Sequence, residues 1–122
     1  MGPVMTVERL EAFNDAWGRA DVPTLMSFMT EDCVYQASVG PEPGATFAGR
    51  TEVEKGFALM LALDRDSESK GGRCFVTSKV GVAEWSYNTP IDGRRVEVRG
   101  CDIFEFEGDT IKRKDAFRKV FG

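Results

Sequence analysis

The chain has 122 residues, of which 42% are hydrophobic, enough for one core, so we expect a single domain over residues 1–122. Its 20 acidic and 16 basic residues leave a formal net charge of -4, which disfavours nucleic-acid binding because phosphate contacts need a basic surplus. The chain contains no histidine. This absence excludes Ser-His-Asp and Cys-His catalysis and imidazole metal sites, and leaves carboxylates, Tyr, Lys and Cys as acids and bases.

The cysteines and the hydropathy pattern indicate where the protein works. Cys33, Cys74 and Cys101 are odd in number and lack CxxC spacing, so we expect free thiols and neither disulfides nor a zinc site. No apolar run approaches the roughly 20 residues that span a bilayer, and the segment MGPVMTVERL lacks the apolar block of a signal peptide. We therefore expect a cytoplasmic protein without membrane contact, metal or cofactor.

The first half of the chain predicts three helices and one strand. Apolar residues at helical spacing predict a helix over 7–20, capped by Thr6, and a shorter helix after Asp21. Residues 33–36 are β-prone, and residues 37–50, with three Gly and two Pro, predict a loop that is either a lid or a plain connection. A capping box at Thr51-Glu54 predicts a third helix to about Asp64.

The second half predicts strands. After the polar stretch 64–72, β-prone segments cover residues 73–77, 80–88, 94–107 and 110–121, with turns at 90–93 and 108–109. Helices followed by an antiparallel meander predict an α+β domain.

The last hairpin predicts which residues face each other. A two-residue loop at Gly108-Asp109 pairs Glu107 with Thr110, and counting back along both strands places Asp102 opposite Asp115. Alternation along the strands then puts both aspartates on the apolar side. A one-residue bulge near the turn would break this pairing.

Two facing carboxylates would have unusual acid/base properties. Opposed Cβ atoms lie about 4.5–5.5 Å apart, so the pair would share a proton or recruit a cation, for which Arg113 is the nearest candidate. We predict Asp102 and Asp115 as catalytic residues, with Arg113 contacting the substrate. The alternative is an ordinary Asp102–Arg113 ion pair with Asp115 at a solvated sheet edge.

Several segments carry a family resemblance: the stretch NDAWGRADVPTLMSFMTEDCVYQ, the loop that closes in FAGR, and the C-terminal RGCDIFEFEGDTIKRKDAF. Together they resemble the SnoaL-like branch of the nuclear transport factor 2-like superfamily, which also contains ketosteroid isomerases, scytalone dehydratases and limonene-epoxide hydrolases. The resemblance implies a cone, in which a curved mixed or antiparallel sheet wraps around three N-terminal helices. It also implies a pocket at the mouth of the cone and a homodimer through the outer face of the sheet.

The resemblance extends to individual residues. Asp102 matches the aspartate that ketosteroid isomerases keep protonated in their oxyanion hole, and Asp115 resembles the acid/base aspartate of SnoaL-type cyclases and epoxide hydrolases. Ala37 and Phe13 stand where the steroid isomerases carry their base aspartate and a tyrosine, which disfavours steroid isomerisation. Scytalone-type dehydration relies on histidine, which this chain lacks.

Three aromatic residues are candidates for substrate binding. Tyr35 matches a tyrosine with which the epoxide hydrolases hold water, whereas Trp85 and Tyr87 replace an Arg and an Asp of those enzymes. All three could form flat apolar walls with polar tips. The alternative is that they pack in the core.

Three functions follow, in order of preference. The first is a cofactor-independent isomerase, aldol-type cyclase or lyase/dehydratase acting on a small hydrophobic carbonyl compound through Asp102 and Asp115. The second is a non-catalytic dimeric module that binds a small ligand, and the third is an epoxide hydrolase. An open pocket of roughly 300 Å³ between Tyr35, Tyr87, Asp102 and Asp115 favours catalysis, and a filled one favours the second function.

Overall fold

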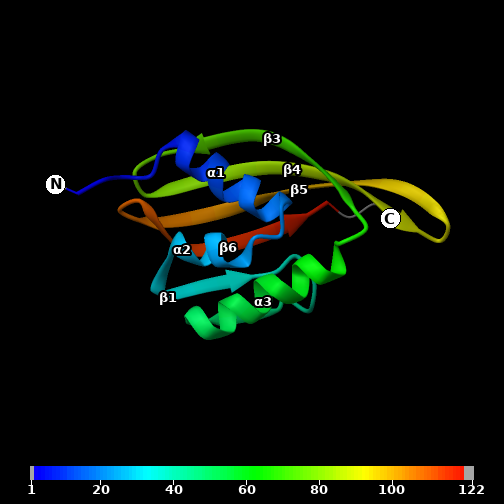
Figure 1. Ribbon diagram of the computed structural model, residues 1–122, viewed down its shortest axis with the longest axis horizontal. Helices are drawn as coiled ribbons and strands as arrows, with labels where there is room; N and C mark the ends of the chain where they lie inside the picture. The colour runs from blue at the N-terminus through cyan, green and yellow to red at the C-terminus, as the bar shows by residue number, and fades with distance from the viewer. Residues whose placement is uncertain (1, 120–122) are drawn as a thin grey trace.

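The computed structural model describes residues 2–119 and shows an α+β fold in which three helices lie on one face of a six-stranded sheet (Figure 1). The sheet has the strand order β2-β1-β6-β5-β4-β3 and is curved around the helices. In chain order the elements are α1 (Val7–Gly18), α2 (Val22–Ser27), β1 (Met29–Gln36), β2 (Thr46–Ala48), α3 (Arg50–Leu63), β3 (Glu68–Val76), β4 (Val80–Ile91), β5 (Arg94–Glu107) and β6 (Thr110–Arg118).

The first two helices begin as predicted. The side chain of Thr6 accepts a hydrogen bond from the backbone N–H of Arg9 at 3.1 Å, which caps α1. Asp21 accepts one from the N–H of Thr24 at 3.3 Å and caps α2. The third helix differs, because α3 begins at Arg50 after Gly49, whose φ of 84° favours glycine, and no side chain caps it. The predicted capping box at Thr51-Glu54 is therefore wrong.

The strands confirm the meander and add two features to it. Strands β3 to β6 pair antiparallel in sequence order, as predicted. However, β1 pairs parallel with β6, and the predicted loop 37–50 contains the short edge strand β2. Strand β3 also begins earlier than predicted, at Glu68. Residues 120 and 121 of the predicted last strand lie outside the described residues.

A β-bulge in β6 changes the predicted register. Glu107 pairs with Thr110 and Phe106 with Ile111, as predicted, but the next pair is Glu105 with Arg113. Lys112 is therefore the extra residue, and every later pair is displaced by one position. Asp102 lies opposite Ala116, and Asp115 lies opposite Ile103.

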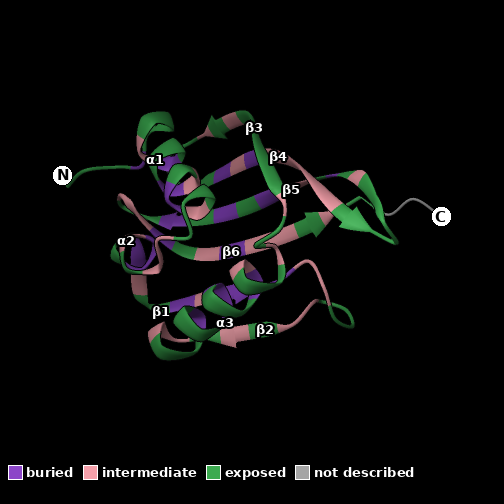
Figure 2. Ribbon diagram, turned by 45° about the vertical axis from the view of Figure 1, so that its right-hand side comes forward, coloured by how far each residue is buried: buried purple, intermediate pink, exposed green. Residues whose placement is uncertain are grey.

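The core fills the space between the helices and the concave face of the sheet, where the buried positions of the strands lie (Figure 2). Phe13 of α1 is at its centre and meets the rings of Phe28, Phe57 and Phe104 edge-on, with centroids 5.5 to 6.2 Å apart. Within residues 2–119, no helix is long and apolar enough to cross a membrane.

Candidate functional site

A buried ion pair lies on the concave face of the sheet. Asp102 of β5 is 5% exposed and Lys114 of β6 is 3% exposed, and Lys114 Nζ lies 3.2 Å from Asp102 Oδ2. The other carboxylate oxygen, Oδ1, accepts a hydrogen bond from Trp85 Nε1 at 3.1 Å. Asp102 is therefore held between two donors, one on each carboxylate oxygen.

Aromatic rings surround the ammonium group of Lys114. Its Nζ lies 4.2 Å from the ring centroid of Trp17 and 4.9 Å from that of Tyr35, which is 2% exposed. Burial, together with the negative charges of Asp102 and Asp64, raises the pKa of Tyr35, so its hydroxyl stays protonated.

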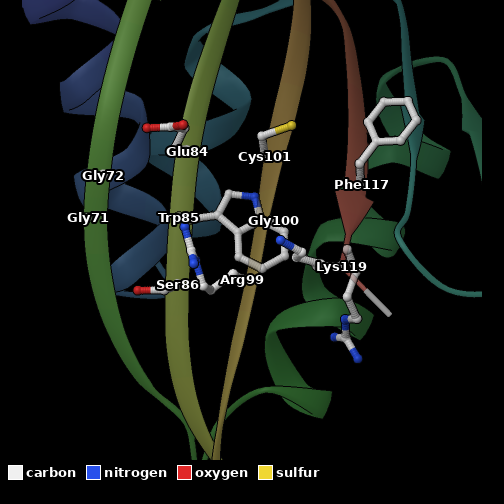
Figure 3. A pocket seen from close by; sticks show the side chains of 11 residues that line it. Gly71, Gly72, Glu84, Trp85, Ser86, Arg99, Gly100, Cys101, Phe117 and Lys119 are labelled. Atoms are coloured by element: carbon white, nitrogen blue, oxygen red, sulfur yellow. The ribbon is translucent and has the colours of Figure 1, made fainter. Parts of the chain in front are cut away.

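A glycine allows Trp85 to reach Asp102. Trp85 pairs with Gly100 on β5, and its indole extends from β4 to the Gly100 position (Figure 3). A Cβ on Gly100 would lie 2.5 Å from Cη2 of Trp85 and would overlap the carbonyl oxygen of Phe117. The missing side chain thus lets the indole lie flat against β5.

A second aromatic ring, that of Tyr87, connects Trp85 with the C-terminal end of β6. The rings of Trp85 and Tyr87 stack with centroids 5.5 Å apart and an interplanar angle of 19°. The Tyr87 hydroxyl accepts a hydrogen bond from Nη2 of Arg118. Burial raises the pKa of Asp64, which follows α3, while the positive charges of Arg118 and Lys114 oppose the increase. Asp64 is therefore within electrostatic reach of both cations.

Asp115 lies apart from this cluster. Its position opposite Ile103, which is 42% exposed, places it on the outer face of the sheet. Asp115 Oδ2 lies 3.4 Å from Nη2 of Arg113, and this Nη2 also donates to Gln36 Oε1. Nη1 of Arg113 lies 3.5 Å from Oε2 of Glu105. Burial raises the pKa of Asp115, and Arg113 opposes the increase. The predicted facing of Asp102 and Asp115 is wrong, because the bulge at Lys112 turns Asp115 outward and Lys114 inward.

Two hollows on the described part of the chain bear on the predicted pocket. One, of about 280 Å³, lies between the 37–44 segment and β6 and is lined by Glu42, Arg113 and Asp115 among others. The other, of about 480 Å³, lies on the sheet where Glu84, Cys101 and Phe117 lie side by side across β4, β5 and β6 (Figure 3). Neither hollow is lined by Tyr35 or Asp102. The prediction of one pocket between Tyr35, Tyr87, Asp102 and Asp115 is therefore wrong, since Asp115 lies on the outer face.

A comparison with protein families identifies the chain. A family model described as a SnoaL-like domain matches residues 10–114. The chain belongs to the SnoaL-like family. This confirms the predicted resemblance.

Solved structures share the SnoaL-like fold at low sequence identity. A protein of unknown function from Mesorhizobium loti, described as NTF2-like, is 22% identical, with a TM-score of 0.77 over 93% of this chain and 89% of that one. A candidate polyketide cyclase from Xanthomonas campestris is 16% identical, with a TM-score of 0.70 over 92% and 88%. A candidate isomerase from Bacillus subtilis is 12% identical, with a TM-score of 0.70 over 92% and 84%. A comparison with curated proteins gives no match.

Of the predicted site residues, Tyr35, Trp85, Tyr87 and Asp102 lie together on the concave face of this SnoaL-like domain, whereas Arg113 and Asp115 lie on the outer face. Lys114 and Arg118 were not among the predicted site residues, because strict alternation assigned both to the outer face. The available signal was Lys114 between Arg113 and Asp115, two residues that alternation placed on the apolar face. A bulge near the turn exchanges the two faces and so brings Lys114 to the apolar face. Within residues 2–119, no three Cys, Asp or Glu residues cluster as metal ligands.

Proposed function

We propose that this SnoaL-like protein is an acid/base enzyme of the isomerase or cyclase type, acting on a small hydrophobic carbonyl compound at the concave face. The observation that carries the proposal is the buried Lys114–Asp102 pair, 3.2 Å apart, at the end of the Trp85–Tyr87 stack. A buried ion pair stabilises a fold weakly, since desolvation offsets its attraction. Its position among aromatic walls supports a chemical role.

The two charges suit enolisation. The carboxylate of Asp102 would take a proton from the carbon next to the carbonyl group, and the ammonium of Lys114 would donate a hydrogen bond to the developing enolate oxygen. Return of the proton to another carbon gives an isomer, and attack of the enolate on a second carbonyl gives a ring. The indole of Trp85 contacts Asp102, and the indole of Trp17 contacts Lys114. Both indoles are partly exposed and would rotate away when the substrate binds.

Hydrogen exchange tests the proposal without knowledge of the natural substrate. We expect the protein to catalyse deuterium uptake by 4-phenyl-2-butanone in D₂O, followed by NMR, and Asp102→Asn to lower the rate by about 100-fold or more. Lys114→Met should lower it similarly, whereas Asp66→Asn, at an exposed turn, should not change it. Exchange that survives Asp102→Asn, or that requires Asp115 instead, contradicts the proposal.

One observation favours the second function, a non-catalytic ligand-binding module. Tyr35, Asp102 and Lys114 are 2–5% exposed, so the floor of the site is closed in this structure. Such a module would bind the ketone, detected by a change in tryptophan fluorescence, without catalysing exchange.

A further inference from the structure

The Nε–Nη2 edge of the Arg118 guanidinium can donate two hydrogen bonds, but in the described part of the chain it makes one. Its Nη2 donates to the hydroxyl of Tyr87, while its Nε is buried and has no hydrogen-bond partner within the described residues. Buried donors are nearly always paired in folded proteins, so an unpaired N–H beside a paired one marks a place for a second acceptor.

Two other arginines of the chain show what this edge binds when both atoms are used. Arg73 donates from Nε and Nη2 to the two carboxylate oxygens of Glu84, at 2.6 and 2.9 Å. Arg95 uses the same two atoms for Oδ1 and the backbone oxygen of Asn88, at 3.0 and 2.9 Å. Each edge binds two oxygens, whereas that of Arg118 has one.

The surroundings of Arg118 select among anions. Tyr87 and Trp85 provide a stacked apolar surface that begins at the guanidinium and ends at Asp102. Asp64, whose charge acts on Arg118, opposes any anion there and opposes a doubly charged phosphate more strongly than a singly charged carboxylate. A carboxylate, with a single charge and two oxygens in one plane, matches the Nε–Nη2 edge.

We propose that Arg118 binds the carboxylate of an organic acid through Nε and Nη2, with the Tyr87 hydroxyl turned to donate to it. The apolar part of the acid would lie on the Trp85–Tyr87 stack. The identity of the substrate rests on the proposed function: if the protein is an enolising enzyme, its substrate is a hydrophobic oxo acid. Its carboxylate would be at Arg118 and its carbonyl group directed toward Lys114 and Asp102.

Calorimetric titration with a matched pair of probes tests the inference. We expect 4-phenylbutanoate to bind wild-type protein at least about tenfold more tightly than 4-phenylbutanamide, because a charge-assisted bidentate contact is lost with the amide. Arg118→Gln should remove this preference by weakening the acid alone. Arg118→Lys, which keeps the positive charge but not the two-donor Nε–Nη2 edge, should remove most of the preference for the acid. Arg99→Gln, a matched loss of an exposed cation that precedes Gly100 and so points to the opposite face of the sheet from Arg118, should retain it.

Equal affinity for acid and amide overturns the inference, as does a preference that persists in Arg118→Gln or is lost equally in Arg99→Gln. Absence of binding of both probes at millimolar concentration also overturns it. Circular dichroism establishes that each variant is folded, and Tyr87→Phe, which keeps the ring, should weaken acid binding a few-fold in its own right. Acid-selective binding without carbon exchange would disprove the proposed function alone, and exchange without acid preference would disprove this inference alone.

Discussion

At the scale of single residues, the packing of the site depends on one glycine, Gly100. Gly100 lies between Trp85 on β4 and Arg118 on β6 in the same row of the sheet. Because Gly100 has no Cβ, the indole of Trp85 lies over β5 and reaches the carboxylate of Asp102. Gly71, on the other side of Trp85 in this row, has open space where its Cβ would be, and so provides a matched control.

Gly100→Ala should therefore destabilise the protein by about 2 kcal/mol or more, since the new methyl group would overlap both backbone and indole. Gly71→Ala should change the free energy of unfolding by less than about 1 kcal/mol. Urea denaturation monitored by tryptophan fluorescence measures both values. Equal effects of the two substitutions would show that Gly100 is not required for the packing of Trp85.

At the scale of secondary-structure elements, one extra residue in β6 decides the chemistry of the site. With Lys112 outside the ladder, Lys114 and Ala116 face the core, and Arg113 and Asp115 face outward. Side chains alternate with a period of two, so a shift by one residue exchanges the faces of the strand beyond the bulge. The bulge thus places a cation, and not a second carboxylate, beside Asp102.

Deletion of Lys112 should be strongly destabilising, because a regular ladder would turn Asp115 inward and Lys114 outward. We expect a loss of about 3 kcal/mol or more, typical of a buried charge left without its partner. Lys112→Ala, which keeps the bulge and removes an exposed side chain, should stay within about 0.5 kcal/mol of wild type. Thermal and urea unfolding measure the difference, and a deletion variant as stable as wild type would contradict this account.

At the scale of the whole molecule, the sheet separates a core side from an outer side that carries exposed apolar groups. Phe75, Val82 and Ile103 are successive partners across β3, β4 and β5, and Phe117 on β6 is 48% exposed. A contiguous apolar area on a sheet face is typical of an interface. The homodimer through this face stays a prediction, supported by these residues.

Sedimentation velocity tests the assembly. We expect wild-type protein to be dimeric at micromolar concentration and Ile103→Glu to be monomeric, because a carboxylate would be buried without a partner at the interface. Leu59→Glu, at a 53% exposed position of α3, should remain dimeric. A monomeric wild-type protein would refute the prediction, and dissociation of both variants would show that the interface is not specific to the outer face.

Most of the helices and strands could be predicted from the sequence, because their signals are local. Helical spacing and caps placed α1 and α2, and turn residues placed the hairpins on either side of β5. Local signals also marked Asp102, Tyr35, Trp85 and Tyr87, since polar and aromatic groups on an apolar strand face are recognisable from alternation. The absence of histidine directed attention to carboxylates, and catalysis by a carboxylate stays a prediction.

The partner of Asp102 could not be predicted from local sequence signals, because it depends on long-range strand pairing. The bulge at Lys112 depends on how β6 fits between β1 and β5, two strands that are distant in sequence from each other. Parallel pairing with β1 aligns Tyr35 with Lys114, and antiparallel pairing with β5 aligns Asp102 with Ala116. Long-range pairing therefore set the register in which a lysine meets Asp102, because side-chain alternation gives two faces but not which one a strand turns to the core.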